Sequence, residues 1–219
     1  MTEAHAPHLT AKPRLRGRPR RDPADAQARQ ALMHSGLAHL TEKGYSATGV
    51  DEILAHARVP KGSFYHYFQN KEAFGLALID AYHAYFVALL DSAFADTTLS
   101  PLHRMRAFTA RAEAGMARHD FRRGCLIGNL GQEMGALPES FRAQLQAVLE
   151  DWQARTAACL EAAKAAGELA NTADCAALAA FFWTGWEGAV LRAKLNRNAV
   201  PLRQFAQIFF SLLETERPD

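Results

Sequence analysis

The chain has 219 residues, 49% of them hydrophobic, and a formal net charge of +2. This length and composition allow one large or two small domains with a buried core and exclude general disorder. The charge is divided unevenly, since residues 1–71 contain 11 Lys and Arg against 6 Asp and Glu, whereas residues 72–219 contain 14 against 17. A basic N-terminal third indicates that a nucleic acid binds there.

Cysteines, hydrophobic runs and the N-terminus bear on the compartment in which the protein works. Cys125, Cys159 and Cys175 form an odd set without CxxC spacing, which argues against a disulfide framework or a zinc site and favours a reducing compartment. No apolar run approaches the ~18 residues of a membrane span, and the polar N-terminus lacks the core of a signal peptide. The sequence therefore predicts a cytoplasmic protein without a membrane, metal or cofactor partner.

Residues 1–22 lack apolar periodicity and are predicted to form a flexible basic arm. The stretch from Lys12 to Arg21 has six basic residues and no acid. It includes an Arg-Gly-Arg-Pro-Arg segment typical of an AT-hook, in which extended arginines enter the narrow minor groove of A/T-rich DNA. The alternative is a solvated tail without base preference. The arginines concerned are Arg16, Arg18 and Arg20.

The rest of the chain has the pattern of an all-α protein. Strand-like alternation is absent, apolar residues recur at helical spacing, and prolines precede helical segments, where a missing N–H is tolerated. Gly44 and Gly167 are the expected C-terminal stops of two helices. The expected helices span residues 24–43, 50–57, 61–68, 71–95, 101–119, 123–135, 138–166, 173–197 and 201–215.

The two short expected helices between residues 50 and 68 predict a helix-turn-helix. The first has apolar residues at helical spacing and Thr48 as a plausible N-cap. In the second, Phe64 and Phe68 share one face at i,i+4 spacing and are predicted to pack inward. Two short helices joined by a tight turn are typical of this DNA-binding motif. Residues 23–70 are therefore expected to fold as a DNA-binding domain.

If the phenylalanines of the second helix face inward, its polar residues and tyrosines are expected on the outer face. Tyr65, His66 and Tyr67 are predicted to face the DNA groove or its phosphates, the alternative for the tyrosines being half-buried packing. We do not expect His66 to bind a metal, because no nearby His, Cys or Asp has the spacing of a second metal ligand. The expected phosphate contacts, which set register without reading bases, are Thr48, Lys61, Lys71 and the backbone N–H groups at Gly62. The expected base-edge contacts are Ser63 and His66.

These residues resemble the signature of the TetR family of transcriptional repressors. The matching positions are Thr48, Val50, Ile53, Ala57, Val59, Gly62, Phe64, Tyr65, Tyr67, Phe68, Lys71 and Glu72. One departure is Arg58, where the family usually has glycine, and a positive φ there would cost arginine ~1 kcal/mol. The resemblance implies an N-terminal three-helix DNA-binding domain and a larger C-terminal helical domain, residues 71–219, for ligand binding and dimerisation.

A homodimer on a palindromic operator is expected, because one helix-turn-helix has a small footprint. The resemblance implies that the last two helices of each subunit form a four-helix bundle between subunits. Both helices carry apolar residues at i,i+3 and i,i+4 spacing, and internal core is the alternative reading of these residues. The expected dimer contacts are Phe181, Phe182, Gly185, Phe205 and Phe209.

The resemblance also implies a small-molecule pocket in the C-terminal domain, whose inducer lowers the affinity for DNA. Residues 123–131 are glycine-rich and weakly helical, which favours close approach to their backbone. The alternative is ordinary core, because tryptophans at helical spacing usually pack. The candidate ligand contacts are Tyr82, Phe86, Cys125, Asn129, Trp183, Trp186 and Glu187.

Cys125 has two interpretations. It is either a small buried hydrophobe, the commonest state of a free cysteine, or a thiol that senses electrophiles or oxidants. In the second case, Arg122 and Arg123 would lower the pKa of the thiol if they face it.

The identity of the inducer rests on a narrower resemblance. Residues 123–133 and 59–63 look closest to the branch of TetR proteins that contains electrophile-responsive repressors and the acrylate utilisation repressor. This implies a small unsaturated or electrophilic metabolite such as acrylate. Its carboxylate would need a basic or N–H partner, for which tryptophan N–H groups, His83 or Arg104 are the candidates.

Two other classes of function compete with this one. An all-α enzyme would need a nucleophile with its base, a phosphate loop or a metal spacing, and the sequence has none of these. An architectural DNA binder acting through the arginine arm alone would show steep salt dependence with little sequence preference, and it leaves the C-terminal portion without a role. We therefore predict a ligand-relieved repressor and not an enzyme.

Overall fold

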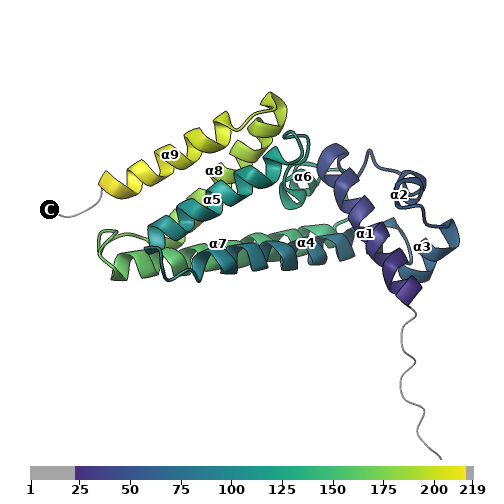
Figure 1. Ribbon diagram of the computed structural model, residues 1–219, viewed down its shortest axis with the longest axis horizontal. Coiled ribbons are helices and arrows are strands. Elements are labelled where there is room, and N and C mark those ends of the chain that lie inside the picture. Colours follow the sequence, from purple (N-terminus) through teal and green to yellow (C-terminus); the bar gives the residue numbers. More distant parts are fainter. Residues whose placement is uncertain (1–22, 216–219) are drawn as a thin grey trace, which may run out of the picture.

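The computed structural model describes residues 23–215. Within that range all regular secondary structure is helical, as predicted, and the chain forms nine helices. Figure 1 shows α1, α2 and α3 as a small head at one end of an elongated body. Arg16, Arg18 and Arg20 lie outside the described residues. The bounds are α1 Pro23–Lys43, α2 Val50–Ala57, α3 Lys61–Tyr67, α4 Lys71–Phe94, α5 Pro101–Ala117, α6 Leu126–Gln132, α7 Ser140–Ala165, α8 Cys175–Asn196 and α9 Val200–Thr215.

The head packs around the aromatic face of α3. Phe64 and Phe68 are buried, as their i,i+4 spacing predicted. Their ring centroids lie 5.3 and 4.8 Å from the ring of Phe74 on α4. Leu32 of α1 and Ile53 of α2 complete this core. Burying a phenylalanine contributes ~1.5–3 kcal/mol relative to leaving it exposed, so this pair decides which face of α3 points inward.

The turn between α2 and α3 is made without glycine. Arg58 adopts the left-handed region with φ 55° and ψ 41°. Its N–H donates to the carbonyl of Ala55, and the N–H of Val59 donates to the carbonyl of Leu54, which covers the last carbonyls of α2. The positive φ considered from the sequence is therefore present, at a cost of roughly 1 kcal/mol for a residue with a side chain.

α4 connects the head to the body. Phe74 and Leu78 are buried against α1, whereas Phe86 and Leu90 are buried further along, in the body. By length and composition alone, α4 is also apolar enough to cross a membrane. Core helices pass the same test, and α4 packs against α1, α5, α6 and α7.

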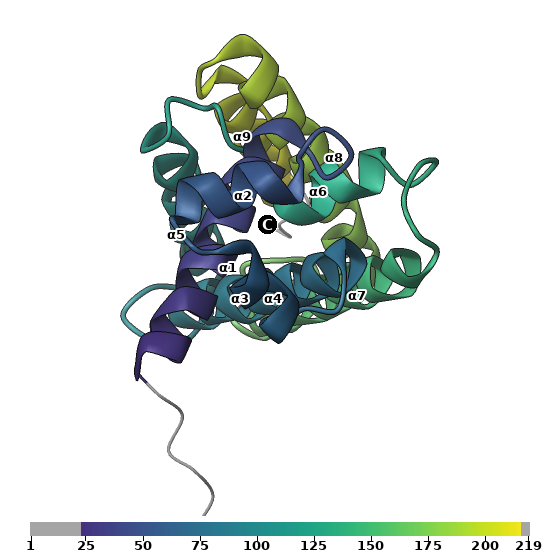
Figure 2. The same cartoon turned by 90° about the vertical axis from the view of Figure 1, so that its right-hand side faces the viewer.

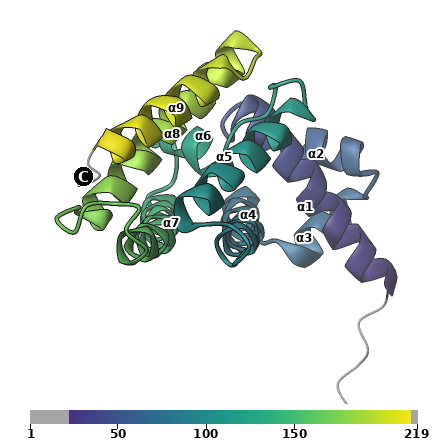
Figure 3. The ribbon, with the colours of Figure 1, turned by 60° about the vertical axis from the view of Figure 1, so that its left-hand side comes forward.

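The body consists of α5 to α9 with most of α4, packed around aromatic side chains. Figure 3 shows α8 and α9 side by side along one edge, with α4 and α7 seen nearly end-on below them. The rings of Trp152 on α7 and Trp183 on α8 lie 4.9 Å apart, and the ring of Phe86 lies 4.3 Å from that of Trp152. These three aromatic side chains are part of the hydrophobic core of the body.

The helix expected over residues 123–135 is shorter in the structure. α6 covers Leu126–Gln132, since residues 123–124 belong to the loop after α5 and residues 133–136 form a turn. The N–H of Gly124 donates to the carbonyl of Thr41 in α1 at 3.2 Å and not to a helical partner. A glycine-rich segment of low helix propensity is easily held out of a helix by such a contact.

Candidate DNA interface and ligand pocket

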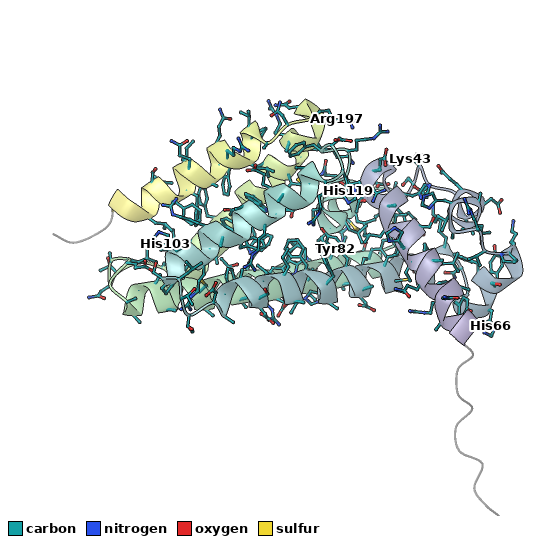
Figure 4. The ribbon with its side chains drawn as sticks, viewed as in Figure 1. Lys43, His66, Tyr82, His103, His119 and Arg197 are labelled. Carbon is teal, nitrogen blue, oxygen red and sulfur yellow. The ribbon has the colours of Figure 1, made fainter. Side chains whose placement is uncertain are left out.

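α3 presents a row of accessible side chains at the outer end of the head. Tyr65 is 54% exposed, Lys61, Gly62 and His66 are exposed, and Ser63 is half-buried. Figure 4 labels His66 at this end, and Figure 2 views the molecule from the same side. Aromatic, imidazole, hydroxyl and ammonium groups on one exposed helix are suited to base edges and phosphates. The DNA contacts themselves stay a prediction.

Thr48 and Lys71, two of the expected phosphate contacts, are committed to the fold. Thr48 is buried and its hydroxyl donates to the carbonyl of Gly44 at 2.7 Å, so it does not cap α2. The ammonium of Lys71 donates to the carbonyl of Tyr45 at 2.7 Å and lies 4.1 Å above the Tyr45 ring. Burial lowers the pKa of Lys71. These polar groups satisfy carbonyls at the end of α1 and in the turn after it, which disfavours the two predicted phosphate contacts without testing them.

Lys61 and Tyr67 also have neighbours within the head. The ammonium of Lys61 lies 2.9 Å from the carboxylate of Asp51 on α2, and this hydrogen bond raises the pKa of Lys61. Tyr67 is half-buried, with its ring 4.9 Å from that of His66 and 6.3 Å from that of Phe68. Tyr67 thus follows the packing alternative more closely than Tyr65 does.

A cavity of about 530 Å³ lies in the body next to the head. Its walls come from α1, α4, α5, α8 and the loop after α5, and its volume is that of a small-molecule site. Figure 4 labels two residues of its lining, Tyr82 on α4 and His119 just beyond α5. The predicted ligand contacts that line the cavity are Tyr82, Phe86, Cys125, Trp186 and Glu187.

Two other predicted ligand contacts, Trp183 and Asn129, do not line this cavity. The indole N–H of Trp183 is buried and donates to the hydroxyl of Thr156 at 3.0 Å. The amide of Asn129 donates to the carbonyls of Leu40 and Thr41 at 3.1 and 2.8 Å. Tryptophan packing, the alternative weighed from the sequence, therefore holds for Trp183.

The proposed carboxylate partners His83 and Arg104 are also occupied elsewhere. His83 Nε2 lies 2.9 Å from the carboxylate of Asp151. The guanidinium of Arg104 donates to the carbonyls of Leu99 and Phe94 at 2.9 and 3.2 Å. Neither side chain lines the cavity, so this expectation is wrong.

The basic residues of the cavity are absent from the ligand contacts that the sequence predicted. They share one end of the cavity and are Arg111, Arg118, His119 and Arg123. Part of this wall could have been predicted from the sequence. Four of its residues recur at helical spacing in the expected helix 101–119, namely Ala112, Gly115, Met116 and His119. The orientation of the loop arginines had no comparable signal.

Tyr82, Cys125 and Glu187 form a polar cluster on the inner side of the cavity. Burial raises the pKa of the Glu187 carboxyl to about 7. Burial, with the nearby Glu187, raises the pKa of the Cys125 thiol, and burial raises the pKa of Tyr82. A Cβ at Gly128 of α6 would collide with the Glu187 carboxylate, so this glycine allows the carboxyl to approach. All three side chains favour their protonated forms when buried in this way.

Arg122 and Arg123 do not activate Cys125. Arg122 Nη2 lies 2.8 Å from a carboxylate oxygen of Glu42, and Arg123 Nε lies 4.0 Å from the other oxygen. The pKa of the Cys125 thiol is raised and not lowered. The two arginines therefore do not act on the thiol in the way that the sensor interpretation required. Cys125 is 7% exposed and has the environment of a buried thiol, which is a weak nucleophile.

Polar contacts join the body to the end of α1. The carbonyl of Thr41 accepts hydrogen bonds from the N–H of Gly124 at 3.2 Å, the amide of Asn129 at 2.8 Å and the ammonium of Lys194 at 3.0 Å. The last carbonyls of a helix lack intrahelical partners, so this end of α1 is open to such donors. Thr41 also lines the cavity. The cavity wall and the head therefore meet at this residue.

A second contact holds the turn after α1. The carboxylate of Glu133, just after α6, accepts from the N–H groups of Tyr45 and Ser46, each at 2.8 Å. Gly44 has φ 92°, and a Cβ there would collide with this carboxylate. Gly44 thus ends α1 as expected and also leaves room for Glu133.

The predicted dimer contacts divide into two groups. Phe181 is 52% exposed and Phe205 is half-buried, with its ring packed where a Cβ at Gly185 would be. Phe182 and Phe209 are buried within one subunit, so these two belong to the internal core, the alternative left open. Other large apolar side chains exposed on α8 and α9 are Leu195, Val200, Ile208 and Leu212.

Known proteins share both halves of this arrangement. Residues 32–78 match the family described as bacterial regulatory proteins, tetR family, and residues 101–209 match the tetracyclin repressor-like C-terminal domain. Transcriptional regulator AcuR of Cereibacter sphaeroides is 63% identical over 203 residues, covering 93% of this chain and 92% of that protein. HTH-type transcriptional repressor NemR of Escherichia coli is 31% identical over 178 residues, covering 80% and 87%.

A solved structure gives the same result. Regulatory protein TetR from Rhodobacter sphaeroides is similar with a TM-score of 0.82 and 64% identity, over 83% of this chain and 96% of that one. AcuR and NemR support the branch suggested by residues 123–133. Their similarity extends through the helix-turn-helix and the body with its cavity. The chain belongs to the TetR family of transcriptional regulators and is not an enzyme.

Proposed function

We propose that the chain is a cytoplasmic, homodimeric repressor whose binding to a palindromic operator is relieved by a small molecule in the cavity. Residues 1–22 are the basic arm, 23–70 the DNA-binding domain, and 71–219 the ligand-binding and dimerisation domain. The observation that carries the proposal is the position of Thr41, which lines the cavity and whose carbonyl accepts three hydrogen bonds from the body.

The exposed side of α3 supports the DNA-binding part of the proposal. Tyr65, His66 and Ser63 enter the major groove, and Lys61 with the N–H groups at Gly62 contacts phosphates. Lys61 exchanges its carboxylate partner Asp51 for a phosphate oxygen when DNA binds. The arginines of the arm add minor-groove contacts beside the operator.

The exposed apolar side chains of α8 and α9 support dimerisation. Phe181 and Ile208 are 52% and 61% exposed, and apolar groups clustered on adjacent helices are typical of a protein interface. The pairing of these two helices with their counterparts in a second subunit buries Phe181 and Phe205. A two-fold axis through this bundle then presents two α3 helices to one palindromic site.

The 63% identity to AcuR supports acrylate, or another small unsaturated or electrophilic metabolite, as the inducer. Apolar side chains such as Phe86 and Trp186, together with the basic residues Arg118 and Arg123, give a cavity that suits a small organic acid. An inducer against Thr41 and Gly124, which both line the cavity, changes the hydrogen bonds that hold the end of α1. It thereby favours a head position that no longer matches the operator.

Two alternatives predict different behaviour. A thiol sensor acting through Cys125 has the thiol inside the cavity in its favour, and it requires release to be abolished in Cys125→Ser. An architectural DNA binder requires binding that an unrelated duplex removes and that falls steeply with salt.

The test is fluorescence anisotropy on the DNA that flanks this protein's own gene, at low and near-physiological salt, with an unrelated duplex as competitor. Binding that survives salt and competitor, and that acrylate then reverses, supports the proposal. Binding that the competitor removes, or specific binding that no small unsaturated acid reverses, counts against it. Light scattering on the same sample reports whether the DNA-binding species is a dimer.

A further inference from the structure

We infer that the basic end of the cavity is a carboxylate site, formed by Arg118, His119 and Arg123, and that the hydrocarbon part of the inducer points inward against the aromatic wall. This inference rests on the proposed function and deepens it, because it assigns the orientation of the ligand and the residues that select an acid over a neutral molecule.

Charge is unevenly distributed over the cavity wall. Of the described residues that line the cavity, Arg111, Arg118 and Arg123 are cationic and Glu187 is the one acid. Within the described part of the chain Arg118 has no ion pair, and Arg111 donates to a neutral serine hydroxyl, that of Ser92, at 3.1 Å. Unneutralised guanidinium groups at the mouth of a low-dielectric cavity attract and orient an anion.

The neighbourhood of His119 shows where this positive field is concentrated. Burial lowers the pKa of His119, and the charges of Arg123 and Arg118 lower it further, whereas Asp120 and Glu42 act in the opposite direction. Arg118, His119 and Arg123 all line the cavity, so the positive charge that acts on His119 lies in the cavity wall. Glu42 makes its short contact with Arg122 at 2.8 Å and lies 4.0 Å from Arg123 Nε. Arg123 is therefore partly neutralised, and Arg118 is, of the two, the arginine without an ion pair among the described residues.

The loop after α5 has a backbone that accounts for this convergence. Asp120 and Phe121 are consecutive residues with φ 50° and 53°. The N–H of Phe121 donates to the carbonyl of Met116 at 3.0 Å, and the N–H of Arg122 to that of His119 at 2.9 Å. Non-glycine residues in the left-handed region are strained and persist where the surroundings hold them, often at ligand sites. Between the lining residues His119 and Arg123 of this loop, Arg122 points away to Glu42.

The inner side of the cavity offers a carboxylate no counter-charge. It presents the rings of Phe86 and Trp186 and the cluster of Tyr82, Cys125 and Glu187, whose titratable groups favour their protonated forms. An inducer carboxylate placed there would meet neutral groups and no cation, so it would lose its hydration without gaining an opposite charge. The charge distribution therefore allows one orientation, with the acid group outward.

Size gives the orientation a measurable consequence. At about 30 Å³ for each water-sized group, a cavity of about 530 Å³ exceeds the five non-hydrogen atoms of acrylate. An acid held by its carboxylate at the mouth has room to extend inward. Each added methylene then buries apolar surface and tightens binding roughly three- to four-fold.

The experiment is calorimetric titration of the full-length protein with propionate, pentanoate and propionamide, none of which reacts with a thiol. We expect propionate to bind at least ten-fold more tightly than propionamide and pentanoate to bind more tightly than propionate. Arg118→Gln and Arg123→Gln should each weaken propionate roughly ten-fold, the scale of a charged hydrogen bond. Arg122→Gln is the matched control, since Arg122 is adjacent but does not line the cavity, and it should bind propionate as the unmodified protein does.

Three results would overturn the inference. They are equal binding of propionate and propionamide, unchanged propionate affinity in both Arg118→Gln and Arg123→Gln, and no binding of any acid. A fall in affinity from propionate to pentanoate would overturn the inward orientation. Arg118→Lys, which keeps the charge, should recover much of the affinity if Arg118→Gln folds poorly. Failure of the proposed function is a separate outcome, because operator binding and its reversal are measured on DNA.

Discussion

The head and the body of this protein differ in where their candidate binding residues lie. Those of the head are on its surface, and those of the body face an internal cavity. In the head, Phe64 and Phe68 fill the interior and Tyr65 with His66 stays outside. In the body, polar side chains such as Glu187 face an internal cavity. A partner as large as a DNA duplex requires an exposed surface, whereas a small ligand requires a hollow that removes it from water. The same kind of helix packing serves both needs by filling one core and leaving a hollow in the other.

The contact between the head and the body differs from both cores, because many of its interactions are hydrogen bonds. The carbonyl of Thr41 in the head accepts hydrogen bonds from Gly124, Asn129 and Lys194 in the body. The N–H groups of Tyr45 and Ser46 donate to the carboxylate of Glu133. Each such bond contributes ~1 kcal/mol net. Bonds of this strength are exchanged without opening either core, which suits an element that must adopt two positions.

The largest effect is expected from a pair of matched tyrosines. Tyr65 on the head and Tyr85 on the body are 54% and 57% exposed. Tyr65→Ala should lower operator affinity roughly 100-fold, because it removes from both subunits a groove interaction worth ~1–3 kcal/mol. Tyr85 lines the cavity and lies outside the head, so Tyr85→Ala should leave the operator affinity of the inducer-free protein unchanged. Anisotropy measures both, and a similar weakening in the two variants would show that the head alone does not read DNA.

The next effect concerns the cavity and the pH dependence of stability. The pKa of Glu187 is raised to about 7 from 4.5, so the folded state binds its proton more tightly than the unfolded state does. Stability from this group is complete below pH ~4.5 and is lost as pH rises through ~7, by up to about 3 kcal/mol. Glu187→Gln should flatten the free energy of unfolding between pH 5 and pH 8, measured by urea denaturation.

The matched control for this experiment is Glu150→Gln, at an exposed carboxyl on α7. It should keep the pH dependence of the unmodified protein. The same dependence in Glu187→Gln would mean that the Glu187 carboxyl is solvated and that the inner side of the cavity is not the low-dielectric site described above.

A smaller effect is expected at the contact between the two regions. Asn129→Ala removes two hydrogen bonds to the end of α1 and should lower stability by about 1–2 kcal/mol. It should also reduce the factor by which acrylate changes operator affinity at least five-fold, the lower end of usual coupling energies. Gln132→Ala is the control, since Gln132 bonds within α6 to Gly128. Equal coupling in the two variants would exclude this contact from the switch.

The smallest effect separates two lysines of the head. Lys61→Gln should reduce the salt slope of operator binding by about 1 for each phosphate that is no longer neutralised, or about 2 for a dimer. Lys71→Gln should leave the slope unchanged and instead lower the melting temperature, because the ammonium of Lys71 holds the carbonyl of Tyr45. A reduced slope in Lys71→Gln would return this residue to the phosphate contacts.

The sequence by itself determined the features that depend on near neighbours. Helical spacing predicted the all-α fold, the inward pair Phe64 and Phe68, and the two short helices of the helix-turn-helix. The residues that form these features lie within one or two turns of each other. Backbone geometry therefore brings them together whatever the rest of the chain does, and Gly44 could be identified as a helix stop for the same reason.

Tertiary structure alone decided which polar groups are free and which are committed. Thr48 and Lys71 match the family signature but are used on carbonyls of the head, and Asn129 reaches Thr41 and not the ligand cavity. Arg118 and Arg123 line the cavity because a loop with two left-handed residues turns them there. Contacts such as that of Lys194 with Thr41, 153 positions apart, depend on how whole helices pack, and helical periodicity in one segment contains no information about the partner across the fold.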